Sequence, residues 1–269
     1  MRRQNGFAFL GFAIMLAAIA ITFIIGEAGI AARAQSSLLD TQKEAYLDMA
    51  AQAVESWYAR NAAAIDAAAA SPFADTDILA LAGIERRWDL RVAQSARLAD
   101  GDIAYRRILL WLPAANPDPS TWDAAAGTFS PGAGVRWRII DGRRIQSQAY
   151  SQTLAAMRAF ARKLELRFYA KAATDSSTYL TVNWFRPRGG CASPNPDDIP
   201  CLDAYTDASL VNWRVILGED PGTLKTAWGQ SLQVSNLTDS SSSYPPYTMA
   251  IAAQTPWGAT MRVLAVQPI

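Results

Sequence analysis

Two cysteines and the carboxylates around them are the residues of this chain best placed to do chemistry. Cys191 and Cys201 enclose a short, proline-rich loop that a disulfide could close in an oxidising compartment. In the chain-entropy model such a bond stabilises the fold by roughly 2.5 to 3 kcal/mol, enough for a local staple. We therefore expect a disulfide here, the alternative being two reduced thiols.

Six carboxylates crowd the same region and could offer oxygen ligands to a calcium ion. Calcium needs six to eight converging oxygens, and no EF-hand spacing is present. Acidic clusters are usually solvated surface. We therefore expect no cofactor and no bound metal, and we keep calcium as the weaker alternative at Asp197, Asp198 and Asp203.

The chain contains no histidine. This excludes Ser-His-Asp and Cys-His catalysis and His-bearing zinc sites, since each of them needs an imidazole. No G-x-S-x-G, S-x-x-K, P-loop or dinucleotide-binding pattern is present. A carboxylate-pair enzyme would need two acids converging in a deep pocket. We therefore expect a non-catalytic protein, and the net charge of +1 gives no electrostatic footprint for nucleic acid.

The N-terminal residues determine how these parts would be arranged. Residues 7–25 carry no charge, and Arg2 and Arg3 precede them. At a rise of ~1.5 Å per residue the run is about 28 Å long, which matches the ~30 Å hydrocarbon core of a bilayer. The two arginines predict a cytoplasmic N-terminus and an exported body. We therefore expect one transmembrane helix.

The same helix is expected to continue to residue 61 as a stalk, with Gly26 and Gly29 as its weak points. Apolar residues repeat in it at intervals of three, four and seven and would pack on a domain. These residues are Leu39, Tyr46, Met49, Ala53 and Trp57. The opposite face carries charged residues, among them Asp40, Glu44, Asp48 and Glu55.

Residues 62–269 are predicted to form one α+β globular domain, with a sub-boundary near residues 174–177. Strand-like runs at 90–98 and 103–112 are joined by an Asp-Gly pair, and a second pair, Asp141-Gly142, predicts another hairpin. Residues 151–173 have helical periodicity, and the last third is β-rich, with runs such as 178–185 and 212–217. The expected fold is a long transmembrane-plus-stalk helix packed on a mainly antiparallel sheet.

A short pattern, Thr-x-Trp-Gly, occurs twice in the β-rich third. Each tryptophan could anchor a loop to the core, while the glycine permits a sharp turn into a strand. Chance recurrence in a tryptophan-rich chain is the alternative. The residues concerned are Trp228, Gly229, Trp257 and Gly258.

Taken together, these features resemble the type IV pilin and type II secretion pseudopilin family. The short charged leader, residues 1–6, resembles a prepilin peptidase site, in which cleavage follows Gly6 and the new amine of Phe7 is methylated. The Trp-Gly turn at Trp257 and a cysteine pair in the last third are also similar to family features. The resemblance implies a filament-core helix containing Phe7, Leu10, Gly11, Ile14, Leu16, Ala17 and Ile21.

Gly11 departs from the family pattern, because most members have a glutamate at the fifth mature position. That glutamate is held to neutralise the N-terminal amine of a neighbouring subunit, and a buried cation without its partner is costly. The resemblance therefore implies a minor or tip subunit and not the major pilin.

By this resemblance the chain would be a non-catalytic minor pilin or pseudopilin of the bacterial inner membrane, with its body in the periplasm and, after assembly, on a surface filament. Its partners would be other pilin subunits, prepilin peptidase, the inner-membrane assembly platform and membrane lipid. The alternative is a periplasmic binding domain that is membrane-anchored or released, since the small-x-small pattern at Ala32 and Ala34 also fits signal peptidase cleavage before Gln35. The filament system and any adhesion target stay open.

Overall fold

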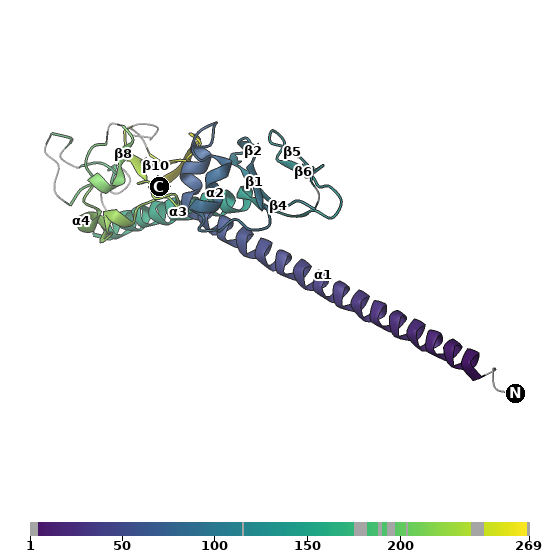
Figure 1. Ribbon diagram of the computed structural model, residues 1–269. Coiled ribbons are helices and arrows are strands. Elements are labelled where there is room, and N and C mark those ends of the chain that lie inside the picture. The colour runs from purple at the N-terminus through teal and green to yellow at the C-terminus, as the bar shows by residue number, and fades with distance from the viewer. Residues whose placement is uncertain are drawn as a thin grey trace.

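The computed structural model describes residues 5–114, 116–174, 182–187, 190–192, 197–202, 204–237 and 245–267; for residues 5–14 and 16–32 it describes the helix without the side chains. The chain belongs to the α+β class with antiparallel sheets, which confirms that part of the predicted fold. A head built of two lobes stands at the end of one long helix (Figure 1).

Helix α1 (Asn5–Ala67) is continuous over 63 residues and passes through Gly26 and Gly29 without a break. Its first part extends away from the head, and its last part packs against the head (Figure 1). The side chains of residues 33–42 are exposed, and burial begins at Tyr46. We call residues 5–39 the projecting segment.

The predicted transmembrane helix over residues 7–25 is corrected by the structure. Among the residues that the structure describes, no helix combines the length and the apolar character needed to cross a bilayer. From Arg33 onward α1 carries charges at intervals of about one turn, such as Asp40, Glu44 and Asp48, and these are used in contacts with the head.

The apolar stripe of α1 is only partly where its spacing predicted. Tyr46 and Trp57 are buried as expected, but Leu39 and Met49 are 43% and 53% exposed. The face that contacts the sheet lies slightly further round the helix, where small residues allow close approach. Its buried members are Tyr46, Leu47, Ala50, Val54, Trp57, Tyr58, Ala62 and Ile65.

The first lobe is an antiparallel sheet of three strands, in the order β1-β4-β7, covered on one face by α1. The Asp-Gly pair at residues 100–101 forms the expected hairpin, with Gly101 at φ 59°. The elements of this lobe besides α1 are α2 (Asp75–Leu81), β1 (Arg91–Gln94), β2 (Leu98–Asp100), β3 (Ile103–Tyr105), β4 (Arg107–Leu112), β5 (Thr121–Asp123), β6 (Thr128–Ser130) and β7 (Arg136–Asp141).

The second predicted hairpin, at Asp141-Gly142, is wrong, because Gly142 is the first residue of helix α3 (Gly142–Thr174). Asp141 Oδ1 accepts a hydrogen bond from the Arg143 amide at 2.9 Å, as a helix N-cap does. Any Cβ at position 142 would collide with the ring of Tyr58. Glycine is therefore present for close approach to α1, and not for a hairpin turn.

The second lobe is a four-stranded antiparallel sheet, in the order β11-β10-β9-β8, against which α3 packs. The predicted strand at 212–217 is wrong: Gly218, at φ 73°, ends a short helix there. Of the predicted strand at 178–185, residues 182–185 are described and are not a strand. The elements of this lobe besides α3 are β8 (Thr206–Asp207), η1 (Ala208–Leu210), α4 (Trp213–Leu217), η2 (Pro221–Thr223), β9 (Gln233–Ser235), β10 (Thr248–Gln254) and β11 (Thr260–Val266).

Each lobe has its own hydrophobic core. The core of the first lobe lies between α1 and the β1-β4-β7 sheet and includes Val54 and Ile108. The core of the second lobe lies between α3 and the β8–β11 sheet and includes Phe160 and Ile251. Because α3 begins beside α1 and ends in the second lobe, it is the structural link between the two cores (Figure 1).

Candidate functional site at the base of the projecting helix

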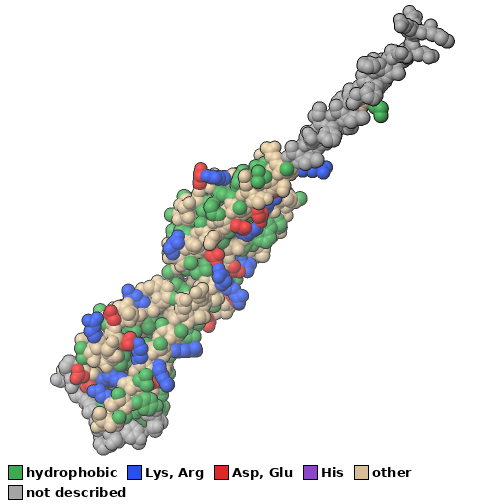
Figure 2. Space-filling model, turned by 90° about the horizontal axis from the view of Figure 1, so that it is seen from below, with side chains coloured by type: hydrophobic (Ala, Val, Ile, Leu, Met, Phe, Trp, Pro, Cys, Tyr) green, Lys and Arg blue, Asp and Glu red, His purple; other side chains and the backbone are tan. Residues whose placement is uncertain are grey.

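A ladder of ion pairs fixes α1 to the edge strand β7. Arg136 lies 3.1 Å from both Asp40 and Glu44, and Arg138 contacts Glu44 and, at 2.7 Å, Asp48. Two turns further along α1, the start of α3 joins the ladder through an ion pair between Arg144 and Glu55. Acidic and basic side chains lie side by side over this lobe (Figure 2).

Sequence reasoning identified the acids of this ladder only as the charged face of the stalk and missed the arginines. A signal was present: Asp40, Glu44 and Asp48 repeat every four residues, as on one helix face, while Arg136 and Arg138 alternate, as on one strand face. A helix row and a strand row of opposite charge can pair only when packing brings them together. The pairing partner is therefore set by the tertiary fold.

A groove of about 770 Å³ runs beside the ladder, between α1 and β7. Its lining includes Ala51, Gln52 and Ile139, together with charged residues that are already ion-paired, such as Asp48 with Arg138. The groove therefore lacks the unpaired charge that a catalytic acid or an ionic ligand site needs.

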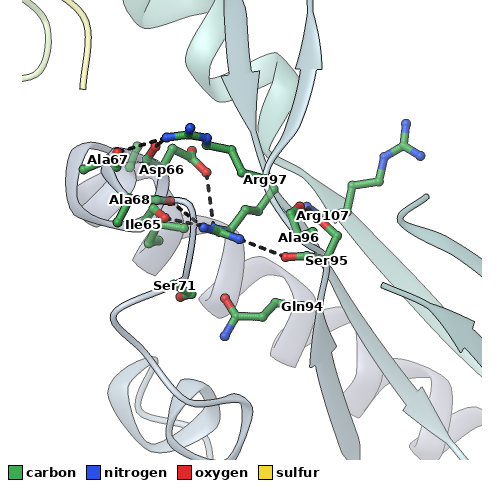
Figure 3. Close-up of polar contacts among 12 residues, drawn as sticks. Ile65, Asp66, Ala67, Ala68, Ser71, Gln94, Ser95, Ala96, Arg97 and Arg107 are labelled. Atoms are coloured by element: carbon green, nitrogen blue, oxygen red, sulfur yellow. Dashed lines mark hydrogen bonds and ion pairs between the residues drawn. The ribbon is translucent and has the colours of Figure 1, made fainter. Parts of the chain in front are cut away.

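Two arginines hold the C-terminal end of α1. Arg106, 2% exposed, donates from Nε to the carbonyl oxygen of Ile65 at 3.0 Å and from Nη2 to those of Ala68 and Ala69 at 2.7 and 2.8 Å. Arg97 donates to the carbonyl oxygen of Ala67 at 3.0 Å. The carbonyls of Ile65 and Ala67 are among those that the end of α1 leaves unpaired, and those of Ala68 and Ala69 directly follow it; the two cations also interact favourably with the negative end of the helix dipole (Figure 3).

Asp66 lies in the centre of this cluster and is fully buried. Its Oδ2 accepts hydrogen bonds from the Tyr58 hydroxyl and from Nε2 of Gln146, both at 2.6 Å. Its Oδ1 lies 3.9 Å from Nε of Arg106 and has no hydrogen-bond partner. Burial raises the pKa of Asp66, although the two hydrogen bonds and the Arg106 charge act in the opposite direction.

This cluster serves structure better than catalysis. Burial also raises the pKa of Tyr58 and lowers the pKa of Arg106. The neighbours of Asp66 are therefore shielded from solvent as Asp66 itself is. Within the described residues no second carboxylate is hydrogen-bonded to Asp66. A carboxylate that solvent and substrate cannot reach has no means of acting on either.

The two Thr-x-Trp-Gly segments form the same turn. In each, the glycine has a positive φ, 85° at Gly229 and 90° at Gly258. In each, the threonine hydroxyl also accepts a hydrogen bond from the backbone amide four residues later. The Trp228 and Trp257 rings meet edge to face, with centroids 5.5 Å apart. The structure thus brings together two motifs that are 29 positions apart in the sequence.

The expected disulfide between Cys191 and Cys201 is confirmed. Arg167 of α3 donates to the carbonyl oxygen of Asp197 and lies 3.9 Å from the Asp198 carboxylate. Arg167 thus places a positive charge beside the Asp198 carboxylate. Asp203 lies outside the described residues, and among those that are described no group of three or more acidic, cysteine or histidine residues could hold a metal.

The predicted processing site, Gly6 and Phe7, lies in the first turn of α1. The other predicted filament-core residues also lie on α1, and their side chains are outside what the structure describes. They are Leu10, Gly11, Ile14, Leu16, Ala17 and Ile21.

Comparisons of the chain with protein-family models, with curated proteins and with solved structures find no match.

Proposed function

We propose that this chain is a non-catalytic filament subunit of the minor pilin or pseudopilin kind, whose projecting helix packs against the helices of other subunits. The observation that carries this proposal is the projecting segment of α1, which extends away from the head (Figure 1). The alternative is a binding domain released by cleavage before Gln35.

The head does not cover the apolar side chains that are described in the projecting segment. Residues 33–39 are all exposed, and Leu38 and Leu39 are 59% and 43% exposed. Most helical stability in proteins comes from packing of an apolar face and not from intrinsic propensity. Equivalent helices of neighbouring subunits would provide such packing, and the small residues Ala13, Ala17 and Ala20 would allow close approach.

The attachment of α1 to the head suits a subunit on which mechanical force acts through the helix. The ion-pair ladder and the Arg106 cluster attach α1 to the head at both ends of their contact, at Asp40 and at Asp66. The disulfide supports a head in an oxidising compartment, which for a filament subunit is the periplasm or the cell surface. Gly11, in place of a counter-charge, supports a minor or tip position.

The test is mass spectrometry of the mature protein isolated from its own cells. The proposal expects a chain that begins at methylated Phe7. A chain that begins at Gln35 would lack most of the projecting segment, and the released-domain alternative would replace the proposal. A substitution at Gly6 should block processing in the first case and have no effect in the second.

A further inference from the structure

The two lobes of the head have separate cores and make a small set of polar contacts with each other. Gln146 of α3 is at the centre of these contacts and is fully buried. Its Nε2 donates to the carbonyl oxygen of Ala62 at 3.0 Å and to Oδ2 of Asp66 at 2.6 Å, both on α1. Its Oε1 accepts from Nε1 of Trp228 at 2.8 Å, in the second lobe.

The chemistry of an amide makes this contact directional. The NH₂ group of Gln146 can only donate and its carbonyl oxygen can only accept. Two acceptors on α1 and one donor on Trp228 therefore leave a single orientation that satisfies every partner. The amide nitrogen of Gln146 therefore contacts the first lobe, and its amide oxygen contacts the second lobe.

The Trp228 turn is fixed on its other sides as well. The amide of Ala227 donates to the Thr153 hydroxyl of α3 at 3.0 Å, and the Trp228 ring packs on Trp257. Nε1 of Trp257 donates at 3.0 Å to the carbonyl oxygen of Asp102, at the tip of the β2–β3 hairpin. Both Thr-x-Trp-Gly turns of the second lobe are thus hydrogen-bonded to first-lobe elements or to the start of α3.

We propose that Gln146 is a positioning residue that sets the second lobe relative to the last turn of α1, so that the Trp228 turn follows any displacement of that turn. The chain of contacts runs from Asp66 through Gln146 and Trp228 to Trp257. The inference goes beyond the filament function and does not rest on it, because every contact lies within one chain.

The experiment measures the distance between the lobes in the purified full chain. Spin labels are placed on exposed residues of each lobe, through Ala125→Cys beside β5 and Val215→Cys on α4. The Gln146→Leu change removes both ends of the contact, and the distance distribution is expected to widen or shift. Gln148→Leu, at an exposed position on the same helix, is the matched control and should leave the distribution unchanged.

A thermodynamic cycle separates positioning from general stabilisation. Asp66 and Trp228 share no hydrogen bond with each other, and both are hydrogen-bonded to Gln146, so any coupling between them should pass through that residue. In the native background, the melting-temperature shift of the double variant Asp66→Asn, Trp228→Phe should differ by about 2 to 4 °C from the sum of the two single shifts. When Gln146 is leucine, the two shifts should add. Trp228→Phe, which removes the indole donor, carries the same distance prediction if Gln146→Leu does not fold. An unchanged distance distribution, or shifts that add in the native background, would overturn the proposal.

Discussion

Nε of Arg138 donates to Oδ1 of Asp48 across 2.7 Å, and this contact joins strand β7 to helix α1 between residues 90 positions apart in the chain. Arg138 also contacts Glu44, one turn earlier on the same helix face. The helix that projects from the head is therefore held by acidic side chains of α1 that pair with a basic side chain of β7.

Charge reversal should test this ladder. Arg138→Glu places a third acid beside Glu44 and Asp48, and we expect a loss of about 1 to 2 kcal/mol in the free energy of unfolding, since these pairs are partly exposed and screened. Urea denaturation at low and at ~1 M salt is the measurement, because screening should shrink the difference.

The compensating variant is the control for that experiment. Asp48→Arg in the Arg138→Glu background restores one pair of opposite charges and should recover part of the loss. No recovery, together with a salt-independent loss, would mean that Arg138 acts through packing alone.

Arg106 should matter more than any residue of the ladder, because it is buried. Arg106→Met leaves the carbonyl oxygens of Ile65, Ala68 and Ala69 without this donor and removes the ion-pair partner of Asp66. We expect a loss of about 3 to 5 kcal/mol in the free energy of unfolding.

Arg86→Met is the matched control, because Arg86 is exposed and lies in the same lobe. It should change the free energy of unfolding by less than about 0.5 kcal/mol in the same urea titration. Equal losses in the two variants would contradict the assigned role of Arg106.

Two features that local patterns predict are present in the structure. Helix α3 follows from apolar residues three and four apart, including Met157, Ala161 and Leu164, and the disulfide follows from two cysteines around a short loop. In both cases the residues that decide the outcome are close in sequence.

The buried cluster at the end of α1 could not be predicted in this way. Arg106 and Arg107 are neighbours of the same type, yet one is buried against α1 and the other is partly exposed beside Asp141. Which side of a strand faces the core depends on the register of the whole sheet. The predicted hairpin at Gly142 was wrong for a related reason, because the role of this glycine depends on its contact with Tyr58, 84 positions earlier.

The Asp66 carboxyl predicts a particular dependence of stability on pH. Its pKa is raised in the folded chain above an ordinary value near 3.8, so the folded state binds more protons than the unfolded state above that pH. The stability that this group contributes is therefore greatest at low pH and falls as pH rises through its folded pKa. The free energy of unfolding, measured by urea titration at a series of pH values, should be compared between the native chain and Asp66→Asn. The advantage of the native chain over the variant should decline as pH rises over this range.

Asp118 gives the opposite sign and is the control for that measurement. Hydrogen bonds from Ser120 lower its pKa, with smaller contributions from Trp111 and Arg91. Its contribution should therefore be lost as pH falls from about 4 through its folded pKa, and Asp118→Asn should abolish that loss. The same slope in both variants would contradict the assignment of Asp66.

The Trp-Gly turns predict a cost that comes from backbone conformation alone. Gly229 and Gly258 have φ values of 85° and 90°, and a Cβ added at either position would meet no atom within 4 Å. Alanine at either position should therefore lower the free energy of unfolding by about 1 to 2 kcal/mol through left-handed strain without any clash. Gly222→Ala is the matched control, because Gly222 has no positive φ and its nearest neighbour, Oδ1 of Asp220, would lie at an ordinary 3.4 Å. Equal thermal stability of Gly258→Ala and Gly222→Ala would mean that the turn can relax, and that the threonine and tryptophan contacts, and not the glycine, define its shape.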